Sequence, residues 1–190
     1  MPKSSAKKLI VIHPASVLEQ KAKPVDITEI TSPKIREIIK DMSEALASSP
    51  EGIGIAAPQI GYSLQIFLAS EEALSIDESR KMTEKERNAK KWEHYVFINP
   101  VITNYSKKKQ KDLEGCLSVP GKFGTVERSE KVTIEAYDAH GKKFHRGASK
   151  LYARLMQHEV DHLNGHLFIE KAHGLMDIHD EPKTQKRHGR

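Results

Sequence analysis

Two segments of the chain carry apolar residues at helical spacing. Residues 32–46 open with a serine cap and Pro33 at the first helical position. The apolar residues that follow are Ile35, Ile38, Ile39, Met42 and Leu46. Residues 150–165 contain one stripe of Leu151, Leu155, His158 and His162 and a second apolar flank of Met156, Val160 and Leu163. We predict an amphipathic N-terminal helix and a second helix that is buried on most sides and stops at Asn164 and Gly165.

Short runs rich in β-branched and aromatic residues lie between the two predicted helices. Residues 64–69, 95–102 and 131–138, and the end of 112–120, have the composition of strands. Residues 138–144, with the sequence DAHGKKF, resemble a hairpin turn between two strands. The pattern indicates a histidine-bearing helix inside a β-rich shell.

The chain length favours a single domain. At 190 residues it is large enough to bury a core but short of the size at which chains usually split. Residues 71–93 are highly charged, so we expect a surface insertion there, with a solvated helix as one form it can take. After Ile169 the composition turns polar. We therefore expect one folded domain over residues 1–170 and a flexible basic tail over residues 171–190.

Charge and cysteine content narrow the class of protein. The formal net charge of +5 leaves nucleic-acid binding as an alternative, but the lysines are spread out and aromatic residues are only 6%. Cys116 is the only cysteine, which excludes an intramolecular disulfide and indicates a reducing compartment. No apolar run approaches the roughly 20 residues that cross a bilayer. We expect a cytoplasmic protein with no membrane partner and no specific nucleic-acid sequence as its target.

The second helix contains the metal-binding pattern H-E-x-x-H. His158 and His162 are four residues apart, which brings two imidazoles to one side of a helix, where they can bind a tetrahedral ion. Glu159 projects beside the first histidine and can carry a proton from the attacking water to a leaving group. Two surface histidines are the alternative, but this pair shares its stripe with Leu151 and Leu155. The sequence therefore favours a metal hydrolase.

A third ligand is needed, and the residues after the helix do not supply it. The longer protease pattern would place a histidine where this chain has Phe168. His166 follows Gly165, which we expect to end the helix and turn His166 off the stripe. Cys116 is the best upstream candidate, because a thiolate binds Zn²⁺ or Fe²⁺ strongly and Gly115 lets the backbone approach an ion. A small buried cysteine in a strand is the alternative.

Three short motifs occur in an order and at separations typical of one family. They are GIGIAAPQIG at 52–61, EGCLS at 114–118 and QHEVDHLNG at 157–165. On these motifs the chain resembles the peptide deformylases, from about Leu9 to about Ile169. The resemblance implies an α+β fold, with antiparallel β-sheets packed around a central metal-binding helix, and an N-terminal helix. It also implies removal of the N-formyl group from the N-terminal methionine of newly made polypeptides, with release of formate.

The resemblance also implies a role for each matching residue of the metal site. It makes Cys116, His158 and His162 the ligands of one divalent ion and Glu159 the general acid and base. Deformylases commonly use Fe²⁺ in the cell and accept Zn²⁺, Ni²⁺ or Co²⁺, and one thiolate with two imidazoles suits all of these ions. The sequence alone does not identify the ion.

The substrate contacts follow from the same resemblance. It implies that the side-chain amide of Gln59 and the backbone N–H of Leu117 bind the formyl oxygen as an oxyanion hole. Gly54 and Gly115 would lie along the peptide backbone, which would pair with the segment around Gly54 like an added strand. The methionine side chain would enter an apolar pocket formed by Ile53, Leu151 and Leu155.

One position departs from the family pattern. Many deformylases have an aromatic residue followed by arginine after SVPG, whereas this chain has Lys122 and Phe123, so the anchoring of the substrate backbone is an open question.

Three other classes of protein remain as alternatives. They are a zinc endopeptidase with another third ligand, a metal-binding homologue without catalysis, and a nucleic-acid-binding module. A ribosome contact through the basic tail is a further expectation, since nascent chains are the expected substrate.

Overall fold

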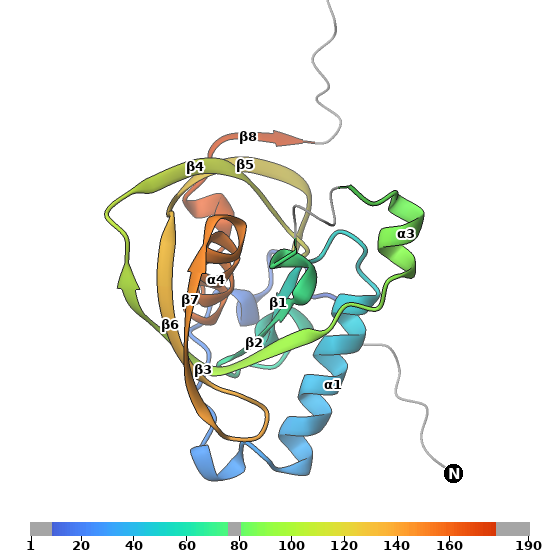
Figure 1. The fold of residues 1–190 in the computed structure, drawn as a ribbon, viewed down its shortest axis with the longest axis vertical. Helices are drawn as coiled ribbons and strands as arrows, with labels where there is room; N and C mark the ends of the chain where they lie inside the picture. The colour runs from blue at the N-terminus through green and yellow to red at the C-terminus, as the bar shows by residue number, and fades with distance from the viewer. Residues whose placement is uncertain (1–8, 76–80, 178–190) are drawn as a thin grey trace, which may run out of the picture.

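Two antiparallel sheets form the framework of the computed structural model, which describes residues 9–75 and 81–177. The five-stranded sheet has the order β1 (Gly54–Ala56), β2 (Ile66–Ser70), β3 (His94–Tyr105), β6 (Lys131–Tyr137) and β7 (Lys143–Ser149). The three-stranded sheet has the order β4 (Lys109–Cys116), β5 (Val119–Ser129) and β8 (His173–Asp177). Every strand pair is antiparallel (Figure 1). The α+β class expected from the sequence is confirmed.

Both predicted helices are present. Helix α1 spans Pro33–Ala47, and the Ser32 side chain accepts a hydrogen bond from the Ile35 N–H at its start. Helix α4 spans Lys150–Leu163, with Asn164 at its C-cap. Gly165 follows with φ of +79°, a conformation that glycine adopts without steric cost. The stop predicted at these two residues is confirmed.

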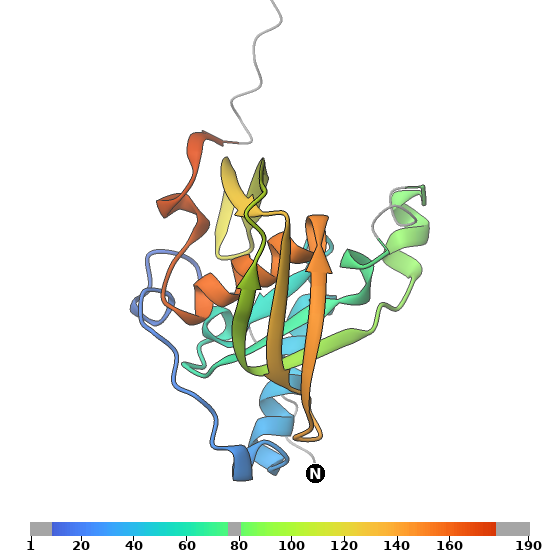
Figure 2. The same cartoon turned by 60° about the vertical axis from the view of Figure 1, so that its left-hand side comes forward.

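Alternating residues of β2 explain why helices cover both faces of the five-stranded sheet. Phe67 and Ala69 belong to the core cluster that contains the α4 residues, whereas Ile66 and Leu68 belong to the cluster that contains the α1 residues. Successive side chains of a strand point to opposite faces, so one continuous apolar strand can bind a helix on each side. Figures 1 and 2 show α4 inside the curve of the two sheets and α1 on the outer side.

Helix α4 is enclosed on most sides, as the sequence predicted. It contacts strands of both sheets, and nine of its residues are buried: Tyr152, Ala153, Arg154, Leu155, Met156, Gln157, Glu159, His162 and Leu163. Four of these nine residues are charged or polar, namely Arg154, Gln157, Glu159 and His162. Because buried polar groups are costly without partners, their presence points to a built polar site along this helix.

The C-terminal segment differs from the sequence expectation. We expected residues 173–177 to belong to a flexible tail. They form β8 and pair with β5, with Phe123 opposite Met176. All five residues are exposed, because strand pairing uses backbone groups and does not require an apolar pattern. The folded part therefore extends past residue 170, and residues 178–190, the rest of the predicted tail, lie outside the described residues.

The described part of the charged insertion contains one short helix. After the 3₁₀ turn η4 (Glu71–Ala73), helix α3 spans Glu84–Ala89 and is capped by Thr83, whose side chain accepts from the Glu86 N–H. Figures 1 and 2 show α3 projecting away from the sheets, as expected for a solvated helix. Across the part of the chain that the structure describes, no helix is long and apolar enough to span a membrane.

Candidate metal and active site

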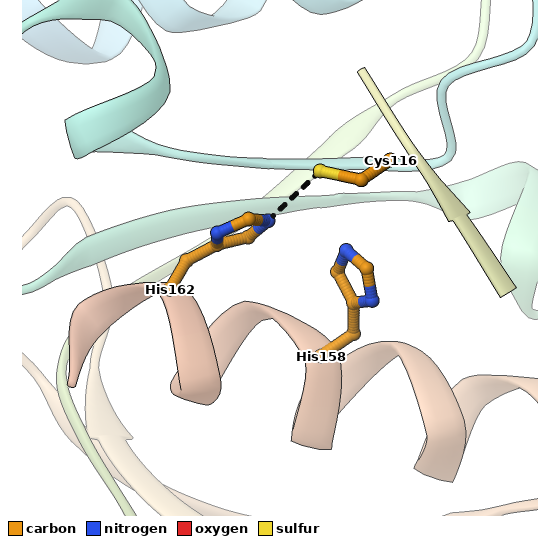
Figure 3. A group of neighbouring side chains, drawn as sticks. All are labelled: Cys116, His158 and His162. Atoms are coloured by element: carbon orange, nitrogen blue, oxygen red, sulfur yellow. Dashed lines mark hydrogen bonds between the residues drawn. The ribbon is translucent and has the colours of Figure 1, made fainter. Parts of the chain in front are cut away.

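Cys116, His158 and His162 converge from a strand and a helix. Cys116 ends β4, the two histidines lie one turn apart on α4, and the three side chains point toward one another (Figure 3). One ligand atom from each residue lies within 4.8 Å of the others, and Cys116 Sγ is 3.2 Å from His162 Nε2. Ligand atoms around a tetrahedral zinc ion are about 3 to 4 Å apart, given metal–ligand bonds of about 2.0 to 2.3 Å. The donor set and its spacing therefore fit a divalent metal ion.

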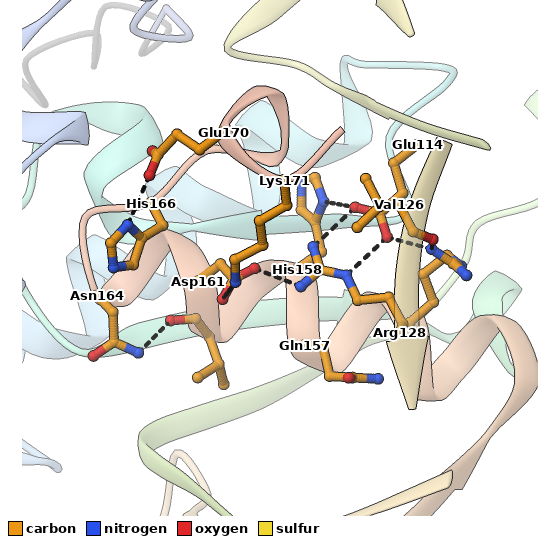
Figure 4. Close-up of polar contacts among 12 residues, drawn as sticks. Glu114, Val126, Arg128, Gln157, His158, Asp161, Asn164, His166, Glu170 and Lys171 are labelled. Carbon is orange, nitrogen blue, oxygen red and sulfur yellow. Dashed lines mark hydrogen bonds and ion pairs between the residues drawn. The ribbon is translucent and has the colours of Figure 1, made fainter. Parts of the chain in front are cut away.

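Glu114 holds the first histidine in position. Its Oε2 atom lies 3.0 Å from His158 Nδ1, so His158 Nε2 is left for a cation. Glu114 also accepts a hydrogen bond of 2.9 Å from Arg128 Nε (Figure 4) and one of 2.6 Å from Arg154 Nη1. Burial alone would raise the pKa of Glu114, but His158 and Arg128 outweigh that effect and hold the pKa well below its usual range. The carboxylate is therefore ionised beside His158.

A second carboxylate, that of Asp161, connects the ion pairs of Glu114 to the C-terminal end of the H-E-x-x-H motif. Arg128 pairs with Asp161, which lies next to His162 in the sequence, and Asp161 also accepts from Lys171 Nζ at 2.6 Å. Arg128 lies on β5 and Asp161 on α4, so the ion pairs join the three-stranded sheet to the helix (Figure 4). The network fixes the cysteine strand against the histidine helix.

The two histidines differ in their affinity for a proton. Burial disfavours the charged form of His158, but hydrogen bonds with Cys116 and Glu114 outweigh burial and raise its pKa to about 10. Burial, and then the charge of His158, lowers the pKa of His162 well below its usual value. A ligating imidazole nitrogen must be free of its proton, so a bound cation would replace the proton that these partners favour.

Gln59 lies beside the cysteine of the metal-binding group. It belongs to the 3₁₀ turn η3 (Ala57–Ile60), and its Oε1 accepts from the Ala56 N–H at 2.8 Å. This bond fixes the orientation of the amide, because only the oxygen can accept. The Nε2 atom therefore faces the site, 3.2 Å from Ser118 Oγ and 3.5 Å from Cys116 Sγ. A preorganised donor stands beside the cysteine ligand.

Glu159 is buried against a glycine. The residue is only 2% exposed, and its Oε2 atom has no hydrogen-bond partner among the described residues. A Cβ atom at Gly54 would lie 2.6 Å from Glu159 Oε1, so the glycine leaves space that the carboxylate occupies. Burial raises the pKa of Glu159 to about 7, although the charge of His158 opposes the shift. The group can hold or release a proton near neutral pH.

These residues surround one cavity of about 510 Å³ between the edge strands β1 and β4. Its lining includes ten of the residues singled out from the sequence: Ile53, Gly54, Gln59, Gly115, Cys116, Leu117, Leu151, Leu155, His158 and Glu159. His162, only 1% exposed, does not line the cavity but belongs to the metal-binding group. His166 pairs with Glu170 and lies outside that group, as its place after Gly165 predicted. The volume is typical of a small-molecule or peptide-end site.

Sequence reasoning missed three buried charged residues around the metal-binding group. Glu114 could have been found, because it lies two residues before Cys116 on a predicted strand and so shares a face with that ligand. A carboxylate next to a ligating histidine is also a common arrangement. Arg128 and Arg154 gave no comparable signal, since an arginine on a strand or helix is usually exposed.

Known proteins match both the sequence and the fold. The polypeptide deformylase family model matches residues 7–177. Peptide deformylase 1A, chloroplastic/mitochondrial, of Arabidopsis thaliana is 40% identical over 164 residues, which cover 85% of this chain and 60% of that protein. Peptide deformylase 1 of Pseudomonas syringae pv. tomato is 36% identical over 179 residues, 94% of this chain and 95% of the relative.

A solved structure agrees with these relatives. The class I type b peptide deformylase from Acinetobacter baumannii matches with a TM-score of 0.74 and 30% identity, covering 88% of this chain and 99% of the other. The matches include the cavity motifs and the strands that carry them, since they extend over most of the described residues. The chain therefore belongs to the polypeptide deformylase family, whose members remove the N-formyl group from nascent peptides.

Proposed function

We propose that this site hydrolyses the formamide of N-formylmethionyl peptides and releases formate. The observation that carries the proposal is the convergence of Gln59, Glu159 and the metal-binding group on one cavity. A carbonyl that enters the cavity would meet both the Gln59 amide and the Glu159 carboxylate in its lining. Both side chains are buried and line one cavity, an arrangement that a homologue without catalysis would not require.

Cys116, His158 and His162 would hold one divalent ion. A bound ion would act as a Lewis acid toward the formyl group and make water a nucleophile near neutral pH. We propose Fe²⁺ as the ion used in the cell, with Zn²⁺, Ni²⁺ and Co²⁺ as possible substitutes, because a thiolate and two imidazoles suit all four. Glu114 keeps His158 oriented for any of them.

Gln59 and Leu117 would bind the formyl oxygen. The Gln59 amide already faces the cavity because the Ala56 N–H holds its oxygen, and Leu117 lines the same cavity beside Cys116. Negative charge grows on the formyl oxygen as water attacks, and donors that are set in place beforehand stabilise that charge without reorganisation. The loss of one such donor typically lowers kcat by about 10² to 10³-fold.

Glu159 would move the proton that the reaction requires. In its ionised form the carboxylate takes a proton from the attacking water, and in its protonated form it gives that proton to the leaving amine as the C–N bond breaks. Glu159 lines the cavity, and no hydrogen bond to another described residue engages its Oε2 atom. A pKa near 7 suits both directions.

The peptide would enter as an extended strand between β1 and β4. Each is an edge strand, so the backbone N–H and C=O groups on its outer side do not pair with another strand of its sheet. The peptide backbone would run along the strand edges at Gly54 and Gly115, and the methionine side chain would enter between Ile53, Leu151 and Leu155, next to the His158 ring. The apolar wall of this pocket suits an unbranched apolar side chain.

Formate release from formyl-Met-Ala, by protein prepared without oxygen and with its metal content measured, tests the proposal. We expect release that depends on the metal and on Glu159. Metal-loaded protein that releases no formate would exclude this function. Cleavage of internal peptide bonds instead would favour the zinc endopeptidase.

We further propose that residues 9–177 act as one catalytic domain in the cytoplasm. A ribosome contact through the basic residues 181–190 stays a prediction, since this segment lies outside the described residues. Unchanged ribosome association after deletion of those residues would exclude it.

A further inference from the structure

The N-terminal strap, residues 9–23, contacts all three sequence motifs of the cavity. The Val11 N–H donates to the Gln59 backbone oxygen and the His13 N–H donates to the Ser118 backbone oxygen, each at 2.8 Å. Further along, the Ala22 N–H donates to the Leu163 oxygen at 2.9 Å, directly after the metal-binding turn of α4. The strap therefore joins segments that are far apart in the sequence.

The contacts of the strap are backbone contacts at close range. A Cβ atom at Gly165 would lie 2.9 Å from the backbone of Glu19 and Gln20, so the end of α4 is packed directly on the strap. Leu18 is fully buried and anchors the strap in between. Such contacts fix position more than they contribute apolar burial, since hydrogen bonds depend on distance and angle.

The two hydrogen bonds from Val11 and His13 involve the segments that carry the proposed oxyanion donors. Gln59 precedes β2 in the five-stranded sheet, whereas Leu117 and Ser118 form the turn between β4 and β5 in the other sheet. Val11 and His13 are alternate residues of the chain, so in an extended backbone their N–H groups point to the same side. One short peptide thus bridges the backbone of Gln59 and the turn that contains Leu117.

We propose that the backbone of Val11–His13 positions the Gln59 amide and the Leu117 N–H relative to each other, and so sets the geometry of the oxyanion hole. These are positioning residues, because they touch the donor segments and not the substrate. The inference rests on the proposed function of the cavity. A misplacement of a reacting group by about 1 Å can lower the rate by about 10²-fold.

Proline at position 11 tests the inference because it removes the N–H that donates to Gln59. We expect Val11→Pro to lower kcat for formyl-Met-Ala-Ser by about 10- to 100-fold, with KM changed less than about threefold. Val11→Ala keeps the N–H and should retain the wild-type kcat. Ile12→Pro is the matched control, since Ile12 is 45% exposed and its N–H has no partner among the described residues.

A double-mutant cycle separates positioning from a general loss of structure. In a Gln59→Ala background, the donor that Val11 positions is already absent, so Val11→Pro should lower kcat by less than about twofold. Binding of the product peptide Met-Ala-Ser, which has no formyl oxygen, should be unchanged in Val11→Pro. An equal loss of kcat in both backgrounds, or a loss as large in Ile12→Pro, would overturn the inference.

Amide hydrogen exchange decides the question if Val11→Pro does not fold. In the wild-type protein the Val11 and His13 amides should be protected, whereas the Ile12 amide exchanges rapidly. Equal rates at all three positions would overturn the inference. If wild-type protein releases no formate, the proposed function fails, while the exchange rates still report whether the strap holds the two segments.

Discussion

The Glu114 carboxylate contacts His158 Nδ1 at 3.0 Å and lies between the guanidinium groups of Arg128 and Arg154. One buried anion thus orients a metal ligand and balances two buried cations. Removing one member of such a group leaves the others uncompensated, at a cost of about 3 to 5 kcal/mol in the free energy of unfolding. The orientation of the ligand and the stability of the domain therefore depend on the same residue.

Glu114→Gln should weaken metal binding by about 10- to 100-fold, because the amide is neutral and no longer polarises His158. The measurement is the Kd for Zn²⁺ or Ni²⁺ at fixed pH. Glu127→Gln is the control, since Glu127 is 43% exposed and pairs with Lys109 on the surface. Equal metal affinity in the two variants would show that Glu114 has no part in holding the ion.

Gly54→Ala should lower kcat by about 10²-fold, because its Cβ would lie 2.6 Å from both Glu159 Oε1 and Leu155 Cδ1 and would displace the proposed proton carrier. Formate release at saturating formyl-Met-Ala measures the effect. Gly147→Ala is the matched control: nothing lies within 4 Å of its added Cβ, and it too is in a strand. A kcat for Gly54→Ala equal to that of Gly147→Ala would contradict the proposed place of Glu159.

Cys116→Ala should abolish tight metal binding, because it removes the thiolate that completes the metal-binding group. The metal content per chain after dialysis is the readout. His166→Ala serves as the control, since His166 lies near His162 in the sequence but pairs with Glu170. Full metal content in Cys116→Ala would favour the endopeptidase alternative, which needs a different third ligand.

Local periodicity predicted the helices but not all of the strands. The apolar repeats of α1 and α4 mark one face of each helix, and a Ser cap or a glycine marks an end, so sequence alone located both. Strand β5 contains Gly121, Gly124 and several charged residues, and β8 is exposed along its whole length. Their pairing depends on backbone hydrogen bonds with a partner elsewhere in the chain, which periodicity does not record.

The candidate site was predictable where residues of a motif are close in sequence. His158, Glu159 and His162 share one helical turn, and the spacing alone brings them together. The contact of Glu114 with Arg128, and that of Val11 with Gln59, joins separate elements. These contacts depend on which elements lie side by side, so they appear only once the fold is known.

His94 should make the stability of the protein depend on pH. Burial lowers its pKa below the ordinary 6.5, and its Nδ1 lies 2.7 Å from Ser43 Oγ. As the pH falls through 6.5, the unfolded chain binds a proton before the folded one does, so stability is lost. His94→Asn should lose less stability than wild type between pH 7.5 and pH 5.5, measured as denaturant midpoints at saturating metal. Parallel midpoints would show that His94 does not contribute.

Phe123 occupies a place where many deformylases have arginine, and it adds an apolar side chain to the lining of the cavity. A Cβ atom at Gly115 would lie 2.6 Å from Phe123 Cε1, so the ring lies over the glycine, and Leu113 lines the same cavity. An aromatic face beside an extended peptide can bury an apolar side chain beyond the first two residues.

Phe123→Ala should therefore lower kcat/KM for formyl-Met-Ala-Phe by about 3- to 10-fold, since partial burial of a ring contributes about 1 kcal/mol. Formyl-Met-Ala, which ends before the third residue, should be processed within about twofold of the wild-type rate. Phe123→Leu should recover most of the loss, because it restores an apolar surface without the ring. An equal loss with both substrates would mean that Phe123 supports the cavity wall and does not select the third residue.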